Sequence, residues 1–355
     1  MVNVSRANRG DVKSRASLRD VAAKAGIGIA TASAVLNGSK TNTRVSEATR
    51  ERVIAVASEL NYHPNALARA LTGQPTRTLG LLFGLERATV AVANPFAFAV
   101  IQGIVAGAAV ERYNVTLFTD PWHDAQRSGG PWRDGRTDGV ILLAVANDSD
   151  VIQTLTEIGV PVIAVSSACT DPNIMSVDVD NAFGARLATQ TLIDYGHLRI
   201  AHLPGDDNLT NAIERQIAFL ETCKDAGIDV PVDYMPAGSF EGPSGYERTL
   251  ALLKLEDRPT AIFAANDTLA VAALQAAAEL GLSVPRDLSV IGFDDIPVAE
   301  FTTPPLTTIQ QPLAEIGATA ARLLIDFLEG RPVDPNTVVF APRLILRGSA
   351  GPVGG

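Results

Sequence analysis

Polar side chains follow two apolar segments whose length and composition are typical of buried strands. Asn266 comes directly after residues 261–265, and Asp294 comes directly after residues 289–293. Arg215 lies near the start of a helical pattern that follows a third segment of this kind. Because ligands of open α/β sheets bind beyond the carboxyl ends of the strands, these three side chains are candidates for one pocket. A carboxylate and a guanidinium there can clamp neighbouring hydroxyl groups of a small molecule.

Other side chains near predicted strand ends have less specific interpretations. Phe96 follows the loop after the first strand segment, and Phe240 follows a short apolar stretch. An aromatic ring at either position can cover the C–H face of a sugar ring. Asp267 and Asp295 are better interpreted as caps of the helices that follow them. The two tryptophans of the chain either line the same pocket or staple an exposed loop.

The sequence carries no specific enzyme motif. Gly26 and Gly28 lack the third glycine of a dinucleotide-binding fingerprint and follow a helical pattern rather than a strand. Residues 242–245 lack the spacing of a nucleophile elbow, and there is no P-loop. The cysteines and histidines show no spacing typical of metal ligands. We therefore expect no enzyme activity, no catalytic residues, no cofactor and no metal, with an enzyme acting on sugars through unpatterned carboxylates as a minor alternative.

Residues 17–60 contain three short helical patterns. Ser17 precedes the first pattern and Asp20 follows three residues later, which predicts a helix start of the capping-box type, with Asp in place of Glu. A turn with two glycines ends this helix, a second helix is expected over 29–36, and a third begins at Ser46. Two short helices across a glycine-bearing turn predict a helix-turn-helix, whose second helix enters the DNA major groove.

The charge of the chain is distributed unevenly. Residues 1–74 contain eleven Lys or Arg against five Asp or Glu, a net charge of +6, whereas the whole chain carries −10, so the remainder carries −16. Such asymmetry is expected when a small region binds a polyanion such as DNA and a larger body does not. The first sixteen residues lack the apolar core of a signal peptide, and no run is long enough to span a membrane. We therefore expect a cytoplasmic, nucleoid-associated protein without a membrane partner.

Four motifs near the N-terminus carry a family resemblance. They read DVAxxAG, TxSxVLNG, VSxxTRxRV and ELxYxPNxxARxL, in that order. With them the chain resembles the lactose and galactose repressor (LacI-type) family of bacterial transcription regulators, and the later chain is similar to the same family almost throughout. The resemblance implies a homodimer that binds a pseudo-palindromic operator. It also implies a hinge helix over 65–71 that folds on DNA, with Leu71 as a minor-groove wedge.

The resemblance assigns DNA contacts as well. Thr31 and Ser33 would contact phosphates, and the exposed positions of the second helix would read bases. The full predicted DNA-binding set is Ser17, Leu18, Ile29, Ala30, Thr31, Ser33, Ala34, Asn37, Asn65, Ala68, Arg69 and Leu71. Ile29, Ala30 and Ala34 occupy positions that more often carry polar base-reading side chains in the family. Apolar groups make no bidentate hydrogen bonds to base edges, so we expect weaker direct readout and more specificity from the hinge and DNA shape.

From residue 78 onward, apolar runs alternate with helical patterns. Strands are expected at 79–83, 115–119, 139–143, 162–165, 176–179, 200–204, 261–265 and 289–293. Helices are expected at 95–111, 151–158, 182–195, 213–226, 244–253, 268–280 and 313–328. Alternating units of this kind predict parallel sheets covered by helices, and the number of strands favours two sheets over one.

The expected fold class is an all-α helix-turn-helix head followed by an α/β body. By resemblance, the body has two doubly wound parallel-sheet lobes like those of type I periplasmic binding proteins, joined by crossovers near 178, 307 and 331. The expected parts are a flexible basic tail at 1–16, the DNA-binding domain at 17–63, a hinge helix and linker at 64–75, an N-terminal lobe at 76–177 plus 308–330, and a C-terminal lobe at 178–307 plus 331–350.

The predicted function is that of a ligand-responsive transcriptional regulator, a repressor, with a small molecule held between the two lobes. The resemblance implies that Arg215, Asn266 and Asp294 hydrogen-bond the effector and that Phe96 and Phe240 pack on it. A carbohydrate is the expected effector, and a purine or nucleoside is the alternative. A solute-binding protein of a transport system is a second alternative, but the basic head and the lack of a signal peptide argue against it.

Overall fold

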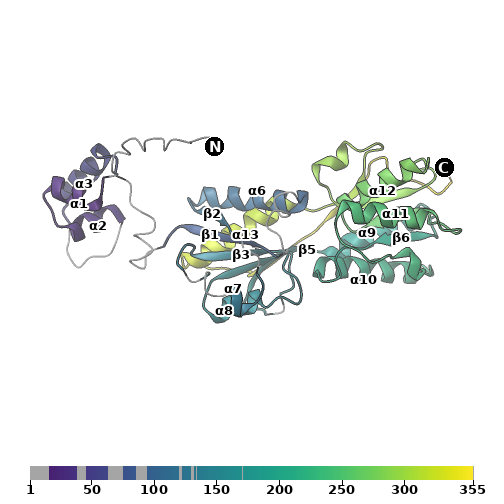
Figure 1. The fold of residues 1–355 in the computed structure, drawn as a ribbon, viewed down its shortest axis with the longest axis horizontal. Helices are drawn as coiled ribbons and strands as arrows, with labels where there is room; N and C mark the ends of the chain where they lie inside the picture. Colours follow the sequence, from purple (N-terminus) through teal and green to yellow (C-terminus); the bar gives the residue numbers. More distant parts are fainter. Residues whose placement is uncertain are drawn as a thin grey trace, which may run out of the picture. The chain divides into compact units, whose positions relative to one another are not determined.

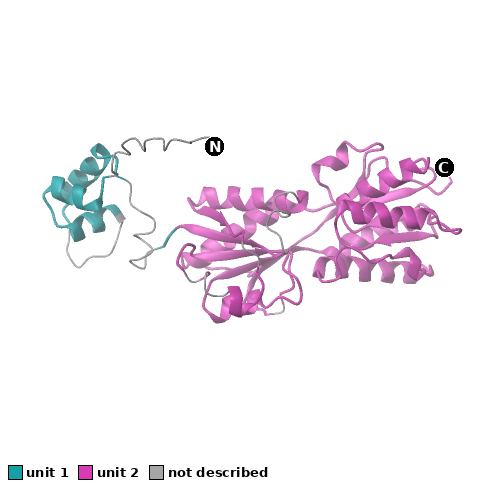
Figure 2. Cartoon of the chain, viewed as in Figure 1, with its two compact units in different colours: residues 1–76 teal, residues 77–355 magenta. Residues whose placement is uncertain are grey.

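The computed structural model of the chain forms two compact units, residues 1–76 and residues 77–355 (Figure 1, Figure 2). The structure describes residues 16–37, 45–62, 75–84, 94–119, 122–128, 132, 134–169 and 171–354. The predicted hinge residues Asn65, Ala68, Arg69 and Leu71 lie outside these ranges. None of the helices within them is both long and apolar enough to cross a membrane.

The first unit contains the three predicted helices, α1 (Leu18–Ala25), α2 (Ile29–Asn37) and α3 (Glu47–Glu59) (Figure 1). The capping box is confirmed, because the Ser17 hydroxyl accepts a hydrogen bond from the Asp20 backbone N–H and the Asp20 carboxylate accepts one from the Ser17 N–H at 2.8 Å. Gly26 ends α1 with a φ of 68°, a left-handed conformation that glycine adopts without strain. The Ser46 side chain caps α3 through the Thr49 N–H.

A small apolar core holds these helices together. It consists of Val21, Ala25, Val35, Val53 and Ala57, which come from all three helices. Because α2 is fixed by its inward face, its outward face is left at the surface of the unit.

The N-terminal lobe of the second unit is built on a parallel sheet. Within the described chain it has six strands in the order β10-β5-β4-β3-β1-β2. The strands are β1 (Thr78–Phe83), β2 (Asn114–Leu117), β3 (Gly139–Leu143), β4 (Val162–Val165), β5 (Met175–Val179) and β10 (Thr337–Phe340). Helices α6 (Pro95–Val110) and α13 (Leu313–Leu328) cover one face, and α8 (Val151–Glu157) covers the other. Strands β3 and β4 are buried throughout, as expected for strands covered on both faces.

The C-terminal lobe repeats this plan with a second sheet. Its described strands run in the order β11-β9-β8-β7-β6, and all pairs are parallel except β11 with β9. The strands are β6 (Ile200–Leu203), β7 (Ala261–Ala264), β8 (Ser289–Asp294), β9 (Thr307–Gln310) and β11 (Arg343–Ile345). Helices α9 (Asn181–Asp194) and α10 (Thr210–Asp225) cover one face, and α11 (Gly242–Leu253) and α12 (Asp267–Glu279) cover the other. The predicted fold class, a helical head and two α/β lobes, is confirmed.

The chain passes between the two lobes three times. The first passage follows β5, and the second lies between β9 and α13, close to the expected positions 178 and 307. The third prediction, a crossover near 331, is wrong. Strand β10 pairs with β5 in the N-terminal sheet, so the chain crosses only after residue 340. Strand β10 lies at the edge of its sheet and alternates between exposed and half-buried residues, so it lacks the continuous buried pattern of β3 and β4.

The two tryptophans belong to the N-terminal lobe and do not line the cavity described below. Trp132 packs on Phe118 with a distance of 4.1 Å between ring centroids, and Trp122 lies 5.9 Å from Trp132. The Trp122 Nε1 donates a hydrogen bond of 2.6 Å to Asp150. The sequence left open whether these tryptophans line the pocket or hold a loop in place. The structure supports the second interpretation, because both rings pack with residues of the N-terminal sheet.

Gly103 allows α6 and α13 to approach closely. A Cβ at Gly103 would lie 2.0 Å from the carbonyl oxygen of Ala314, a backbone atom that cannot turn away. We expect Gly103→Ala to lower the free energy of unfolding by about 1–3 kcal/mol, as overpacking does. Thermal unfolding of this variant should show a melting temperature several degrees below that of the parent. Ala106→Ser, at an exposed position of the same helix, should change stability by less than about 0.5 kcal/mol. Equal melting temperatures for the two variants would contradict the close contact.

Candidate functional site

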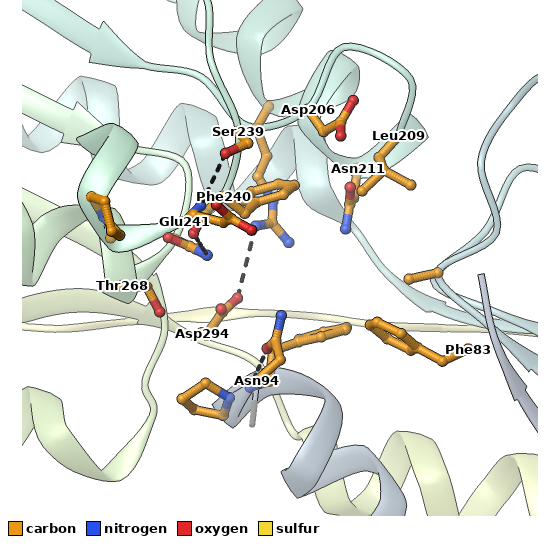
Figure 3. A pocket seen from close by; sticks show the side chains of 17 residues that line it. Phe83, Asn94, Asp206, Leu209, Asn211, Ser239, Phe240, Glu241, Thr268 and Asp294 are labelled. Atoms are coloured by element: carbon orange, nitrogen blue, oxygen red, sulfur yellow. Dashed lines mark hydrogen bonds and ion pairs between the residues drawn. The ribbon is translucent and has the colours of Figure 1, made fainter. Parts of the chain in front are cut away.

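A cavity of about 690 Å³ lies between the two lobes, beyond the carboxyl ends of strands from both sheets (Figure 3). Its polar lining consists of Asn94, Asp206, Asn211, Arg215, Ser239, Glu241, Asn266, Thr268 and Asp294. Its apolar lining consists of Phe83, Pro95, Phe96, Ala144, Leu209, Phe240, Gly242 and Pro243. Aromatic walls with a few convergent polar groups are typical of a small-molecule site.

The structure brings together all five residues that the sequence predicts for the effector site. Phe96 comes from the first turn of α6 in the N-terminal lobe. Arg215, Phe240, Asn266 and Asp294 come from the C-terminal lobe and line the same cavity. The predicted site is therefore a single place in the fold, with groups from both lobes, while the contacts of these residues with an effector stay a prediction.

Arg215 is fixed by several contacts at the base of the cavity. Its Nε donates a hydrogen bond of 3.0 Å to Asn181, and its Nη1 donates one of 2.6 Å to the carbonyl oxygen of Ala265. Nη1 also lies 3.7 Å from the Asp294 carboxylate, and the guanidinium lies 3.6 Å from the centre of the Phe293 ring. Burial lowers the pKa of Arg215 from its usual value, and the Asp294 carboxylate opposes this change. An arginine held in this way presents a rigid, charged surface to a ligand.

Asp294 is a buried acid at the end of β8. Its Oδ1 accepts a hydrogen bond of 2.6 Å from the Gln311 side chain. Burial raises its pKa to about 6, although the Arg215 charge and the Gln311 hydrogen bond act in the opposite direction. Its φ of 117° is rare for a residue other than glycine. Strained backbone of this kind is concentrated at functional sites, where the surrounding structure holds it.

Two acids close to Asp294 in the fold, Asp267 and Asp295, bond to other parts of the protein and not to the cavity. The Asp267 carboxylate accepts hydrogen bonds from the Ile296 N–H at 2.9 Å and the Thr308 hydroxyl at 2.5 Å. Asp295 pairs with Arg347 at 2.7 Å. Neither acid lines the cavity, so their interpretation as structural residues agrees with the structure. Their expected role as helix caps does not, because the α12 cap is Asn266, which accepts from the Leu269 N–H at 2.8 Å.

Two helices begin at the cavity and are capped by asparagines that line it. Asn94 Oδ1 accepts hydrogen bonds from the backbone N–H groups of Phe96 and Ala97, at 3.0 and 3.3 Å. Asn266 Oδ1 accepts one such bond, from the Leu269 N–H in the first turn of α12. Each asparagine therefore satisfies a helix terminus with its oxygen, so the side chain is held in one orientation at the cavity wall.

Sequence reasoning missed several lining residues that simple signals could have revealed. Asp206 follows β6 as Asn266 follows β7, so the rule of strand ends applies to it equally. Asn211 precedes Arg215 by four residues on α10, which places the two on one helix face. Glu241 is next to Phe240 in sequence. By contrast, Phe83 is the last residue of a buried strand and carries no sequence signal for a pocket.

Hydrogen bonds join the two lobes beside the cavity. The Asn147 N–H donates to the Asn208 carbonyl oxygen at 2.9 Å, and the Asn208 side chain donates to Asp148 at 2.7 Å. The Thr210 hydroxyl donates to the Asn147 side chain at 2.6 Å. The loops after β3 and β6 are thus held together, and Arg215 connects to the first crossover through Asn181, the first residue of α9.

The head presents a mixed surface along α2. Ile29 is 46% exposed, and Ala30 is also exposed, while Thr31 and Ser33 are half-buried. Ala34 differs from its predicted role, because it is only 6% exposed and belongs to the buried set of the chain. At the start of α1, Ser17 is exposed and Leu18 is half-buried, and Asn37 is the last residue of α2.

Comparison with known sequences identifies both units. The family described as "Bacterial regulatory proteins, lacI family" matches residues 17–65. The family described as "Periplasmic binding protein-like domain" matches residues 189–350. The first match covers the capped helices of the head, and the second covers most of the C-terminal lobe together with α13 and β10.

Whole proteins of the same organisation are similar to this chain. The HTH-type transcriptional regulator CelR of Thermobifida fusca is 35% identical over 94% of this chain and 98% of that protein. The ribose operon repressor of Escherichia coli (strain K12) is 35% identical over 94% of this chain and 100% of that protein. The HTH-type transcriptional repressor PurR of Escherichia coli O139:H28 is 33% identical over 94% of this chain and 96% of that protein.

Solved structures of transcription regulators are also similar to this chain. A complex of the transcriptional regulator CelR with cellobiose has a TM-score of 0.72, with 34% identity over 94% of this chain and 100% of that chain. A lac repressor dimer bound to operator and the anti-inducer ONPF has a TM-score of 0.81, with 27% identity over 95% of this chain and 99% of that chain. With a helix-turn-helix head, two α/β lobes around a polar cavity and relatives of this identity over nearly their whole length, the chain belongs to the lacI family of bacterial transcription regulators.

Proposed function

We propose that this regulator is a repressor that binds a pseudo-palindromic operator as a homodimer and releases or tightens it in response to a small molecule. The observation that carries the proposal is the combination, in one chain, of a capped helix-turn-helix unit and a cavity lined by two joined lobes. A ligand that binds one degree of lobe closure more tightly shifts the population toward it. If that state also changes operator affinity, the two sites are coupled.

The proposed effector is a carbohydrate. Arg215 and Asp294 offer fixed hydrogen-bonding groups at the base of the cavity, and Phe96 and Phe240 offer aromatic surface. Among the relatives, CelR was solved with cellobiose and another protein is named for the ribose operon. A purine is the second candidate, because a repressor named PurR is 33% identical to this chain.

The proposed DNA surface is the exposed side of α2 with the start of α1. It includes Ile29, Ala30, Thr31 and Ser33, with Ala34 omitted because it is buried. The hinge residues over 65–71 complete the surface in the proposal. The proposed domain division follows the sequence expectation, except that the last crossover is placed after residue 340. Binding at the nucleoid in the cytoplasm, without enzyme activity, is part of the same proposal.

A gel-shift assay with genomic DNA fragments tests the DNA-binding function directly. Binding should weaken steeply as salt increases, because phosphate contacts release counterions. Light scattering at micromolar concentration should give the mass of a dimer. Binding that does not depend on salt, or a monomer under these conditions, would contradict the proposal and leave the solute-binding alternative.

Effector affinity is expected to depend on pH through Asp294. Its pKa of about 6 means that the carboxylate is ionised at neutral pH and takes up a proton as the pH falls below that value. Because a carboxylate accepts hydrogen bonds from ligand hydroxyls and its protonated form accepts fewer, affinity should fall about tenfold from about pH 7.5 to about pH 5. Isothermal titration calorimetry across this range measures the change.

Asp294→Asn provides the control for this pH dependence. The amide keeps the shape of the side chain but does not titrate, so the affinity of this variant should be nearly constant over the same range. Asp267 and Asp178 are further buried acids near this pair among the described residues. Burial raises the pKa of Asp267 well above its usual value and that of Asp178, which interacts with the Arg215 charge, to about 7. A pH profile that is unchanged in Asp294→Asn would assign the titration to Asp267 or another group and refute the prediction.

A further inference from the structure

We propose that Gln311 is a positioning residue of the effector site, which holds the Asp294 carboxylate and connects it to the second crossover between the lobes. Together with Asn181 at the first crossover, it completes a buried chain of four side chains that passes through Arg215 and Asp294. Neither Gln311 nor Asn181 lines the cavity, so both act on an effector through the two residues that do. The inference rests on the proposed function, because it concerns the same site.

The four side chains contact one another in turn. Asn181 Oδ1 accepts a hydrogen bond of 3.0 Å from Arg215 Nε, and Arg215 Nη1 lies 3.7 Å from Asp294 Oδ1. The same carboxylate oxygen accepts a hydrogen bond of 2.6 Å from Gln311 Nε2. Each of the four residues is at most 4% exposed, and hydrogen bonds that involve a charged group are strong where water is excluded. A displacement of one member is therefore expected to displace the next.

The chain of side chains ends at two of the segments that join the lobes. Asn181 is the first residue of α9, directly after the first crossover. Gln311 follows the last residue of β9, and its carbonyl oxygen accepts a hydrogen bond of 2.9 Å from the N–H of Leu313, the first residue of α13. Gln311 therefore lies within the second crossover. Because lobes close by backbone rotation in the segments that join them, a change of lobe arrangement moves both ends of the chain.

The amide group of Gln311 is satisfied at one end only. Its Nε2 donates to Asp294, whereas its Oε1 is buried and has no hydrogen-bond partner within the described part of the chain. An unpaired buried acceptor destabilises a fold, but turning the amide over would place Oε1 against an ionised carboxylate, which has no proton to donate. The bond to Asp294 therefore determines the orientation of Gln311. The contacts with Arg215 and Gln311 both reach Oδ1 of Asp294, which leaves Oδ2 for an effector.

The neighbouring residue, Gln310, makes a similar bond outside the site. Gln310 Nε2 donates a hydrogen bond of 2.6 Å to Asp295, so two adjacent glutamines bond to two adjacent aspartates. Asp294 lines the cavity, whereas Asp295 does not and pairs with Arg347. The same residue type and the same kind of bond therefore occur in this segment with and without a connection to the effector site.

The buried chain makes the lobe arrangement and the effector-binding groups depend on each other. A change at the second crossover shifts Gln311 and with it the Asp294 carboxylate. Conversely, an effector that binds Asp294 favours the lobe arrangement in which Gln311 holds this carboxylate in the right place. The coupling free energy is the same in both directions. Breaking the chain at one end should therefore loosen the crossover at the other end, even without an effector.

Amide hydrogen exchange of the full-length protein without effector tests this chain. Gln311→Met keeps an unbranched side chain of similar length but removes the amide donor and acceptor. Exchange in residues 179–184, at the first crossover, should become about fivefold to tenfold faster, because local opening of this segment loses one of its restraints. Gln310→Met is the matched control. It should change exchange in residues 179–184 by less than about twofold, since its bond does not reach the effector site.

Asn181→Ala breaks the chain at its other end and gives the reciprocal test. It removes the acceptor for Arg215 Nε, so exchange in residues 309–314, at the second crossover, should become about fivefold or more faster. This measurement remains decisive if Gln311→Met does not fold.

The titration of Asp294 is a readout that a purely structural role of Gln311 would not change. Carboxyl NMR signals of isotope-labelled aspartate follow it, and the signal of Asp294 is identified by its absence in Asp294→Asn. Gln311→Met removes a donor to the carboxylate and leaves Arg215 and Asp267, the charged groups next to it, in place. It should therefore raise the pKa of Asp294 by about one pH unit, whereas Gln310→Met should leave this titration as in the parent.

Several outcomes would overturn the inference. They are exchange at the first crossover that is equal in Gln311→Met and the parent, an equal acceleration by Gln310→Met, exchange at the second crossover that is unchanged in Asn181→Ala, and an Asp294 titration that does not respond to Gln311→Met. Failure of the proposed function would appear differently, as the absence of salt-sensitive DNA binding by the parent protein, a measurement that involves none of these variants.

Discussion

Arg215→Ala is expected to remove effector binding, with a loss of affinity of about a hundredfold or more. The variant loses a charged donor at the base of the cavity and also the group that faces the Asp294 carboxylate at 3.7 Å. Because one partner of a buried ion pair is left without the other, the free energy of unfolding should fall by about 3–5 kcal/mol. Calorimetry gives the first quantity, and denaturant unfolding of the body gives the second.

Arg215→Lys separates the charge from the geometry. A lysine keeps the positive charge but replaces the planar fork with a single ammonium group, which does not reproduce bonds to Asn181 and Ala265 together with the contact to Asp294. We expect this variant to recover most of the stability and only a small part of the affinity. Binding by Arg215→Ala that equals that of the parent would refute the assignment of the effector site.

The connection from Arg215 to Asn181 suggests how the site could report on the ligand. Asn181 begins α9 directly after the first crossover between the lobes, and its amide nitrogen also donates to Glu214 at 3.0 Å. A ligand that displaces Arg215 would therefore act on a residue next to the first crossover between the lobes. These contacts form a continuous path for the proposed coupling between effector binding and operator binding. The coupling itself requires that the effector bind one arrangement of the lobes more tightly than another.

Strands that are buried on both faces were predictable from the sequence, and partly exposed strands were not. Strands β3, β4 and β7 are buried on both faces, so they appear as unbroken apolar runs that are easy to find. Strands β9, β10 and β11 were missed because they are short and contain polar residues such as Thr307, Thr337 and Arg343. These three strands also carry the later crossovers, so the error near 331 is a direct consequence of missing β10.

Residues of the candidate site could be predicted where they follow the carboxyl end of a strand, because ligands of open α/β sheets bind there. Residues that reach the cavity only because the two lobes meet were harder to predict. Asn266 and Asp294 stand directly after the apolar runs of β7 and β8. Asn211 could have been found from its place on the same helix face as Arg215. Phe83 lines the cavity because the two lobes face each other there, and no local pattern encodes how the lobes face each other. The low exposure of Ala34, 6%, was likewise not evident from the sequence.

Ala30→Glu is expected to reduce DNA affinity about tenfold or more, for specific and non-specific fragments alike. Ala30 is exposed on α2, a helix without acidic or basic residues. If this face enters the major groove, a carboxylate there lies near phosphates and base-edge acceptors and gains no compensating donor. Gel shifts at several salt concentrations should show the defect shrinking as salt increases, because screening weakens the repulsion.

Ala55→Glu is the matched control for this prediction. Ala55 is exposed on α3, so the substitution changes the net charge of the head by the same amount at a different surface. We expect it to reduce DNA affinity less than about threefold, because a charge outside the groove acts only through the screened field of the whole head. Melting curves should show that both variants keep the head folded, since neither position belongs to the apolar core. Equal defects in the two variants would mean that net charge, and not the face of α2, determines binding, and an unaffected Ala30→Glu would place DNA on another surface of the head.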